Sequence, residues 1–297
     1  MKKKLMLMWA AVAVIAIAMP VAVSQAAIVI YEPFDYTPGV IDGSQAGGTG
    51  LSATGWTTSG ATEFQSVITP GLDFPGLLTQ GNALRRNDRT GQSEANRAIS
   101  AASQTALTAD NSTIWFSLLI DTEESFAKAN NLTFLFGTDT VDNPKEDTPT
   151  ISGGEGLGIS FLKNKSGATL TAITVDDGIS SRSDGSIGPF PNSLDDPHRY
   201  LLFIAGKIDW AANGSDDTLT LYNITDTAAA LPAPFATMTA DLDQSQFDTL
   251  VVSDKNRAIV DEIRFGDTLA DVTPVPEPTT IALLGLGGLG IFRRRRA

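Results

Sequence analysis

Short apolar runs that alternate with polar residues dominate the chain between Ile28 and Val272, and no long stretch repeats apolar residues at helical spacing. Successive side chains of a β-strand point to opposite faces, so this alternation predicts strands with one face in a core. Gly, Asn, Asp, Ser and Pro separate the runs, as at Asn213 and Gly214, a pair typical of tight turns. The pattern predicts an all-β fold, a sandwich of two stacked sheets. Ten strands are expected, at residues 28–31, 64–68, 113–121, 132–137, 156–162, 169–175, 199–208, 218–223, 249–252 and 258–265.

Other segments are expected to connect these strands. Residues 85–106 and 121–131 lack a continuous apolar stripe, so each is interpreted as a loop or a short surface helix. Residues 39–60 are rich in Gly, Ser and Thr and contain Trp56, which indicates an ordered loop. Residues 180–197 are expected to form an exposed loop. No internal repeat at a fixed period is present, which favours one domain.

The N-terminal residues have the three parts of a secretory signal peptide. Three lysines at residues 2–4 precede an apolar run at 5–23, and Ser24 and Ala26 supply the small side chains that a signal peptidase requires. Cleavage is predicted after Ala26, with Ala27 as the near alternative. An uncleaved anchor is the other interpretation, since the apolar run approaches the ~20 residues that span a bilayer.

The C-terminal residues combine three elements in order. Pro276, Glu277 and Pro278 precede an apolar run at residues 281–292, and a basic stop follows it. As a helix, residues 279–292 would reach only about 21 Å across a hydrocarbon core of ~30 Å, which favours transient insertion over permanent anchoring. The alternative is a buried core helix, but four consecutive arginines directly after the run argue against it. This membrane stop consists of Arg293, Arg294, Arg295 and Arg296.

These C-terminal features resemble the PEP-CTERM sorting signal of Gram-negative bacteria. The resemblance implies recognition of the Pro-Glu-Pro segment by an exosortase, a membrane transpeptidase that removes the tail. It also implies export across the inner membrane and delivery to the cell surface or the extracellular matrix. The predicted organisation is a signal peptide at 1–26, one domain at 27–273 and a sorting signal with a short hydrophobic helix at 274–297.

Charge and cysteine content exclude several classes of protein. Without the two ends, 14 basic and 33 acidic side chains remain, a net charge near −19. Such a charge opposes binding to nucleic acid and to anionic lipid. The chain has no cysteine, which excludes disulfides, Cys-ligated zinc and thiol catalysis.

A second resemblance concerns the domain itself. Residues 200–210 (YLLFIAGKIDW) and 217–222 (DTLTLY) resemble the central hairpin of LamG-like, concanavalin A-type jelly rolls, and residues 259–266 (IVDEIRFG) resemble their last strand. The opening residues 31–36 (YEPFDY) are similar to those of surface proteins with a PEP-CTERM tail. The resemblance implies a two-sheet jelly-roll sandwich. Such folds carry lectins, enzymes and structural modules alike.

The acidic residues do not form the pattern that glycoside hydrolysis needs. Two carboxylates must face one cleft about 5–10 Å apart, whereas Asp261 and Glu262 are adjacent and point to opposite faces of a strand. A structural role in the last strand is expected for both. His198, the single histidine, follows two aspartates in a loop without a partner nucleophile. The prediction is a protein without catalytic residues.

Calcium is the one cofactor that the sequence leaves open, because its six to eight oxygen ligands often come from loop carboxylates. The favoured residues are Asp176, Asp177, Asp216 and Asp217, and a further group is Asp139, Asp142 and Asp147. None matches an EF-hand loop. Solvated turn residues are the alternative interpretation.

Large aromatic residues are the candidates for contact with carbohydrate. Trp56 and Trp210 lie at expected loop positions, so both are predicted to be exposed and to stack on sugar rings. Trp115 lies in the middle of an expected strand and is assigned to the core.

The functional hypothesis combines these features. The chain is predicted to be a non-catalytic exported surface or matrix protein that binds polysaccharide or a matrix protein. Its partners during export would be signal peptidase and exosortase, with transient insertion of the C-terminal segment into the inner membrane. A carbohydrate-active enzyme, a hydrolase or lyase, and a structural surface protein without a ligand are the alternatives.

Overall fold

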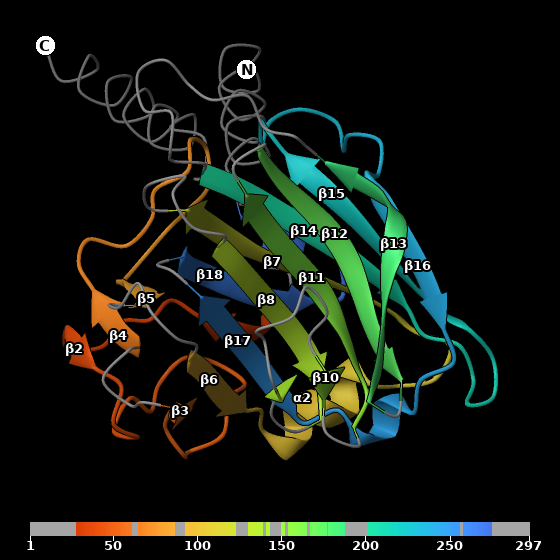
Figure 1. Cartoon of the computed structure of the whole chain (residues 1–297), viewed down its shortest axis with the longest axis horizontal. Coiled ribbons are helices and arrows are strands. Elements are labelled where there is room, and N and C mark those ends of the chain that lie inside the picture. The colour runs from red at the N-terminus through yellow and green to blue at the C-terminus, as the bar shows by residue number, and fades with distance from the viewer. Residues whose placement is uncertain are drawn as a thin grey trace, which may run out of the picture.

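The computed structural model describes residues 28–60, 65–86, 93–122, 130–138, 141–142, 150–151, 154–164, 167–176, 178–187, 201–255 and 258–274. These residues form two antiparallel sheets that face each other across one core, together with a two-stranded hairpin (Figure 1). The nine-stranded sheet contains, in spatial order, β16 (Ala236–Ala240), β15 (Asp217–Ile224), β14 (Leu201–Asp209), β7 (Thr113–Thr122), β18 (Ala258–Gly266), β5 (Ala83–Arg86), β4 (Gln65–Ile68) and β2 (Gly39–Val40), with β1 (Ile28–Glu32) paired to β18. The seven-stranded sheet contains β13 (Ile179–Ile187), β12 (Gly167–Asp176), β11 (Gly156–Asn164), β8 (Asn130–Gly137), β17 (Thr249–Lys255), β6 (Ser93–Ala98) and β3 (Thr57–Gly60). The hairpin pairs β9 (Val141–Asp142) with β10 (Thr150–Ile151).

The core between the sheets is built by alternate residues of each strand. On β7, Ile114, Phe116 and Leu118 point inward and are at most 1% exposed. The ring of Phe116 lies 5.9 Å from that of Phe134 on β8 and 5.6 Å from that of Phe265 on β18, centroid to centroid. A side chain at position 206 of β14 would collide with the Phe116 ring, so glycine there makes room for it. The predicted alternation thus decides which face of each strand enters the core.

Among the described residues, three short helical segments lie in the connections. Helix α2 (Ala101–Leu107) begins at Ser100, whose Oγ accepts a hydrogen bond from Ser103 N. The one-turn helix α3 (Leu269–Val272) has a capping box between Thr268 and Asp271. A 3₁₀ turn, η2 (Gln244–Gln246), precedes β17.

The structure confirms the all-β, two-sheet jelly-roll sandwich and the central strands of both sheets. Two expectations for connecting segments are wrong in part, although helix α2 agrees with the short helix allowed for residues 85–106. Residues 85–106 contain the end of β5, strand β6 and helix α2, because β6 pairs with β17 over six residues despite its polar sequence. Residues 179–187 form strand β13, which pairs with β12 and was expected to be loop. Tertiary pairing overrides weak local propensity at both places.

Candidate functional site

The two tryptophans expected to contact carbohydrate are buried, which corrects that prediction. Trp56 is 0% exposed and Trp210 is 3% exposed. Trp56 Nε1 donates to Glu32 Oε2 at 2.9 Å, and Trp210 Nε1 donates to the carbonyl of Leu107 at 2.5 Å. Both indoles have a polar partner inside the protein, so each fills the core from a loop.

Trp115, expected in the core, instead points out from the nine-stranded sheet. Its neighbours Ile114 and Phe116 are the residues that face inward, so the pleat places Trp115 on the opposite face. The indole is partly exposed and stacks on the partly exposed ring of Tyr222 on β15, with centroids 5.7 Å apart and planes 28° apart. Ala205, a small residue on the intervening strand, lies beside Tyr222 in register. The two aromatic rings therefore form one accessible surface.

Polar side chains continue this surface along the strands. Lys207 pairs in register with Trp115 on one side and with Thr220 on the other. Lys207 Nζ lies 2.7 Å from Asp209 Oδ2, and Asp209 Oδ1 accepts from Thr113 Oγ1 at 2.6 Å. We call the surface formed by Trp115, Tyr222, Lys207, Asp209, Thr113 and Thr220 the aromatic platform.

The other half of the same sheet face is covered. Phe74, in the segment between β4 and β5, packs its ring 5.2 Å from the ring of Phe203 on β14. The cluster also contains Leu72, Leu77, Leu119 and Ile259, and Tyr222 packs at its rim. The aromatic platform therefore begins where the covering segment, residues 69–82, ends.

Three charged residues of β18 hold the covering segment in place. Asp261 Oδ2 accepts from Leu72 N at 2.7 Å, and Glu262 Oε1 accepts from Gln80 N at 2.5 Å. The Arg264 guanidinium forms an ion pair with Glu262 and donates to the carbonyl of Leu78 at 2.5 Å. A bulge lies between Asp261 and Arg264, where Glu262 adopts a φ of 55°. These contacts agree with the structural role expected for Asp261 and Glu262.

Burial controls the ionisation of these carboxyls. Burial, together with the nearby Glu262 carboxylate, raises the pKa of Asp261 to about 9, although the Leu72 and Glu262 N–H groups and Arg264 partly offset the increase. Burial also raises the pKa of Glu262, partly offset by Arg264 and by the hydrogen bonds from Gln80 and Tyr31. Both carboxyls are occupied by protein partners, which leaves no oxygen poised for substrate chemistry.

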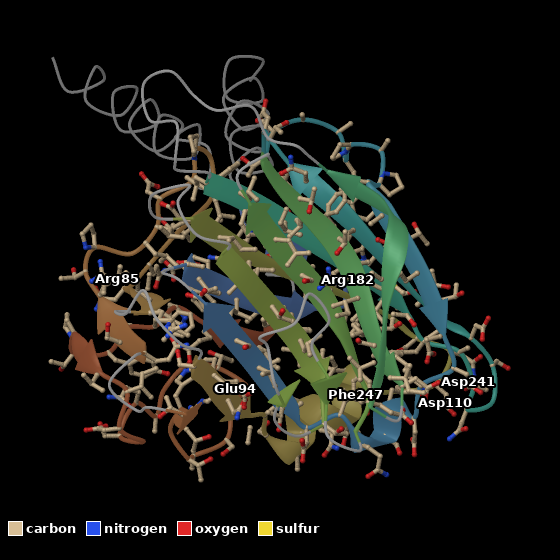
Figure 2. All side chains as sticks on the ribbon, in the orientation of Figure 1. Arg85, Glu94, Asp110, Arg182, Asp241 and Phe247 are labelled. Atoms are coloured by element: carbon tan, nitrogen blue, oxygen red, sulfur yellow. The ribbon has the colours of Figure 1, made fainter. Side chains whose placement is uncertain are left out.

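The outer face of the seven-stranded sheet carries a polar row in register across four strands. The row contains Ser160, Thr133, Ser253 and Glu94, all at most 4% exposed. Figure 2 shows Glu94 and Arg182 on this sheet. An extended ligand has no access to side chains that are this deeply buried. The aromatic platform is therefore the better candidate of the two outer faces.

Acidic residues gather at one end of the sandwich, where Figure 2 shows Asp110 and Asp241 near Phe247. Asp217 accepts from Ala211 N at 2.7 Å and from Leu242 N at 3.2 Å, and Asp241 accepts from Gly214 N at 3.0 Å. Burial raises the pKa of Asp217, and the nearby carboxylates of Asp241 and Asp110 also raise it. Burial likewise raises the pKa of Glu155, and nearby aspartates add to the shift. These carboxylates tie neighbouring loops together.

The predicted calcium ligands do not converge among the described residues. No three acidic or histidine side chains in that part of the chain lie at metal-binding spacing. Asp217 is buried with both oxygens bonded to backbone N–H groups, whereas Asp176 and Asp216 are exposed. Asp177, Asp139 and Asp147 lie outside the described residues, and the side chain of Asp142 is not described. Calcium binding therefore stays a prediction.

The remaining predicted positions lie outside the described residues. They are the cleavage residues Ala26 and Ala27, His198, the motif Pro276, Glu277 and Pro278, and the arginines at 293–296. Within the described ranges, none of the helices has the length and apolar character of a membrane span.

Comparison with known proteins identifies one motif and a set of distant structural likenesses. Residues 274–296 match the family of the PEP-CTERM protein-sorting motif, so the chain carries the sorting signal of an exported protein processed by exosortase. Comparison with curated proteins yields no match.

The solved structures that match this chain distantly include the following three. A legume lectin-like domain from Entamoeba histolytica is 11% identical, with a TM-score of 0.40 over 72% of this chain and 90% of that one. The carbohydrate recognition domain of Emp47p is 8% identical, with a TM-score of 0.41 over 83% and 99%. A carbohydrate esterase from the Shiga toxin-encoding bacteriophage phi24B is 13% identical, with a TM-score of 0.38 over 72% and 90%.

The aromatic platform was missed at the sequence level, although a signal for it existed. The alternation of Ile114, Phe116 and Leu118 already assigns Trp115 to the other face of the strand. The partner ring of Tyr222 lies 107 positions further along the chain and is brought close only through β14.

Proposed function

We propose that the chain is a non-catalytic, exported surface protein whose sandwich binds a neutral polysaccharide on the aromatic platform. The observation that carries the proposal is the stacked, partly exposed pair of Trp115 and Tyr222 on an open sheet face. Export and processing follow from the sorting motif at residues 274–296. Cleavage near Pro276 and attachment to the cell surface or matrix are parts of the same proposal.

Aromatic rings beside hydroxyl groups suit the two chemical sides of a sugar. The C–H face of a pyranose packs on an aromatic face, and its hydroxyls exchange hydrogen bonds with polar neighbours. Thr113 and Thr220 supply hydroxyls beside the rings, and Lys207 and Asp209 supply a donor and an acceptor. A flat sheet face also admits an extended chain, which favours a polymer over a single sugar.

Charge favours a neutral ligand. The whole chain has a net charge of −13, and Asp110 and Asp241 lie in the loops before β7 and after β16, two strands of the sheet that carries the platform. An anionic polysaccharide would meet repulsion from these carboxylates. Lys207 is already paired with Asp209, so it offers little attraction to an acidic sugar.

Carboxylate placement supports binding over hydrolysis. Glycoside hydrolysis uses two carboxyl groups that face the bond to be broken. Among the described residues that form the platform, Asp209 is the one carboxylate, and it is held by Lys207 and Thr113. An acid–base pair is therefore missing from the platform residues.

The test is affinity electrophoresis of the domain through gels that contain a neutral glucan or, in parallel, an anionic alginate. We expect the neutral polymer to retard the native domain. Trp115→Ala should weaken the affinity about tenfold or more, which corresponds to about 1.4 kcal/mol. Ile179→Ala, an exposed apolar residue on the other sheet, is the matched control and should bind normally. Equal retardation of both variants would refute the platform, and release of reducing sugar would favour the enzymatic alternative.

A further inference from the structure

The chain leaves the sandwich at a point that is fixed to the folded domain. Helix α3 lies on the outer face of the nine-stranded sheet, where Ser117 Oγ donates to the carbonyl of Val272 at 2.6 Å. Two residues later, the carbonyl of Pro274 accepts from Leu78 N at 2.9 Å. The sorting motif begins at this same residue, 274. The folded domain and the sorting signal are therefore contiguous.

The spacer between this point and the apolar run is short. Residues 275–280 separate Pro274 from Ile281. Even fully extended, six residues span at most about 20 Å, and the polar headgroup zone of one leaflet takes up about 6 Å of that distance. When the apolar run is in a bilayer, the surface around Pro274 must lie close to the lipid headgroups.

Exposed leucines surround the exit point. The described residues include five large apolar side chains that are exposed: Val40, Leu78, Ile179, Leu201 and Leu231. Leu78 is 45% exposed and bonded to Pro274 through its backbone, and Leu231 is 37% exposed and lines a small hollow with Thr273. We call Leu78 and Leu231 the exit leucines.

We propose that, before the tail is removed, the sandwich rests on the bilayer surface with the exit leucines in contact with the lipid interface. The tail provides the high local concentration, so weak apolar contacts suffice despite the acidic charge of the domain. Once the tail has been cut, the same surface has no affinity of its own for membranes. This proposal rests on the membrane stage of the sorting route and is independent of polysaccharide binding.

The absence of native cysteine allows single-cysteine spin labelling of the protein that begins at residue 27, without the apolar N-terminal run, and keeps its C-terminal tail; this is the full-length protein of the experiment. Leu78→Cys, Leu231→Cys and Ile179→Cys variants are labelled with a nitroxide and reconstituted in phosphatidylcholine vesicles. Flotation of the vesicles reports whether the tail has inserted. We expect labels at 78 and 231 to be protected about threefold or more from a water-soluble nickel complex, and the label at 179, which is 72% exposed, to stay accessible.

Two further proteins test whether the protection depends on the tail and on its short spacer. A chain that ends at residue 274 should not float, and each of its three labels should be as accessible with vesicles as without them. Insertion of 20 Gly-Ser residues between Pro274 and Val275 should remove the protection while flotation persists. The proposal would be overturned if the labels at 78 and 231 were as accessible on floating full-length protein as on the truncated chain. Protection that requires added exosortase would also overturn it, since the contact would then be with protein. Failure of the full-length protein to float would overturn the membrane stage of the route and this proposal with it, while binding to polysaccharide would be unaffected.

Discussion

Two ion pairs on the same face of the nine-stranded sheet have the same spacing and different surroundings. Glu262 and Arg264 on β18 are separated by one residue, as are Lys207 and Asp209 on β14. The side chains of the first pair are at most 2% exposed, whereas those of the second pair are 38% and 32% exposed for Asp209 and Lys207. One pair lies beneath residues 69–82, and the other forms part of the aromatic platform.

The covering segment determines what each half of the sheet face can do. Beneath it, charged groups are bound to backbone atoms of Leu72, Leu78 and Gln80 and hold the segment to the sheet. Beyond it, similar residues remain in contact with water and are available to a ligand. The first pair is expected to affect folding, and the second pair to affect binding.

Removal of one partner of the buried ion pair is expected to have the largest effect on stability. Glu262→Ala would leave the Arg264 charge buried without its partner, which typically costs about 3–5 kcal/mol of unfolding free energy. Urea denaturation monitored by tryptophan fluorescence measures this loss. Glu262→Gln retains part of the hydrogen bonding and should fall between the variant and the native protein. A loss below about 1 kcal/mol for Glu262→Ala would show that the segment is held by its apolar contacts alone.

The pH dependence of stability is the next largest effect expected. The pKa of Asp261 in the folded protein, about 9, lies above its unfolded value near 4, so the native state binds one more proton between these values. The contribution of Asp261 to the unfolding free energy is fully present below pH 4. It declines as pH rises towards 9, by at most about 1.4 kcal/mol per pH unit. Denaturation curves between pH 5 and 9 test this sign.

Asp261→Asn provides the control for the pH experiment, because an amide cannot ionise. In this variant, the folded and unfolded states should differ by about one fewer bound proton between pH 5 and 9. The slope of unfolding free energy against pH should be shallower by the corresponding amount. An unchanged slope would assign the titration to another buried group, such as Glu32, whose pKa is also raised by burial.

Loss of the exposed pair should have the smallest effect on folding. Lys207→Ala is expected to reduce the unfolding free energy by about 0–1 kcal/mol, because water screens this ion pair. The same variant should weaken polysaccharide retardation severalfold, since Lys207 lies in register with Trp115. Normal binding together with a large loss of stability would reverse the distinction between the two halves of the face.

The sequence-based assignment of tryptophans to surface or core was wrong at three positions. Trp56 and Trp210 were assigned to the surface because they lie in loops. Both loops fold back over the core, where Glu32 and the carbonyl of Leu107 accept their indole N–H groups. Trp115 was assigned to the core because it lies in a strand, although the strand has an outer face as well.

Strand alternation and a contiguous motif are local properties, so the β-sandwich, the inward face of its central strands and the sorting signal could be predicted along the chain. The three-dimensional fold was needed to show which part of the outer face is covered, which tryptophan is accessible and which leucines lie beside Pro274 and Thr273. These features depend on residues far apart in the sequence, such as Gln80 with Glu262 or Trp115 with Tyr222, and no local pattern encodes which distant segment will cover a given face.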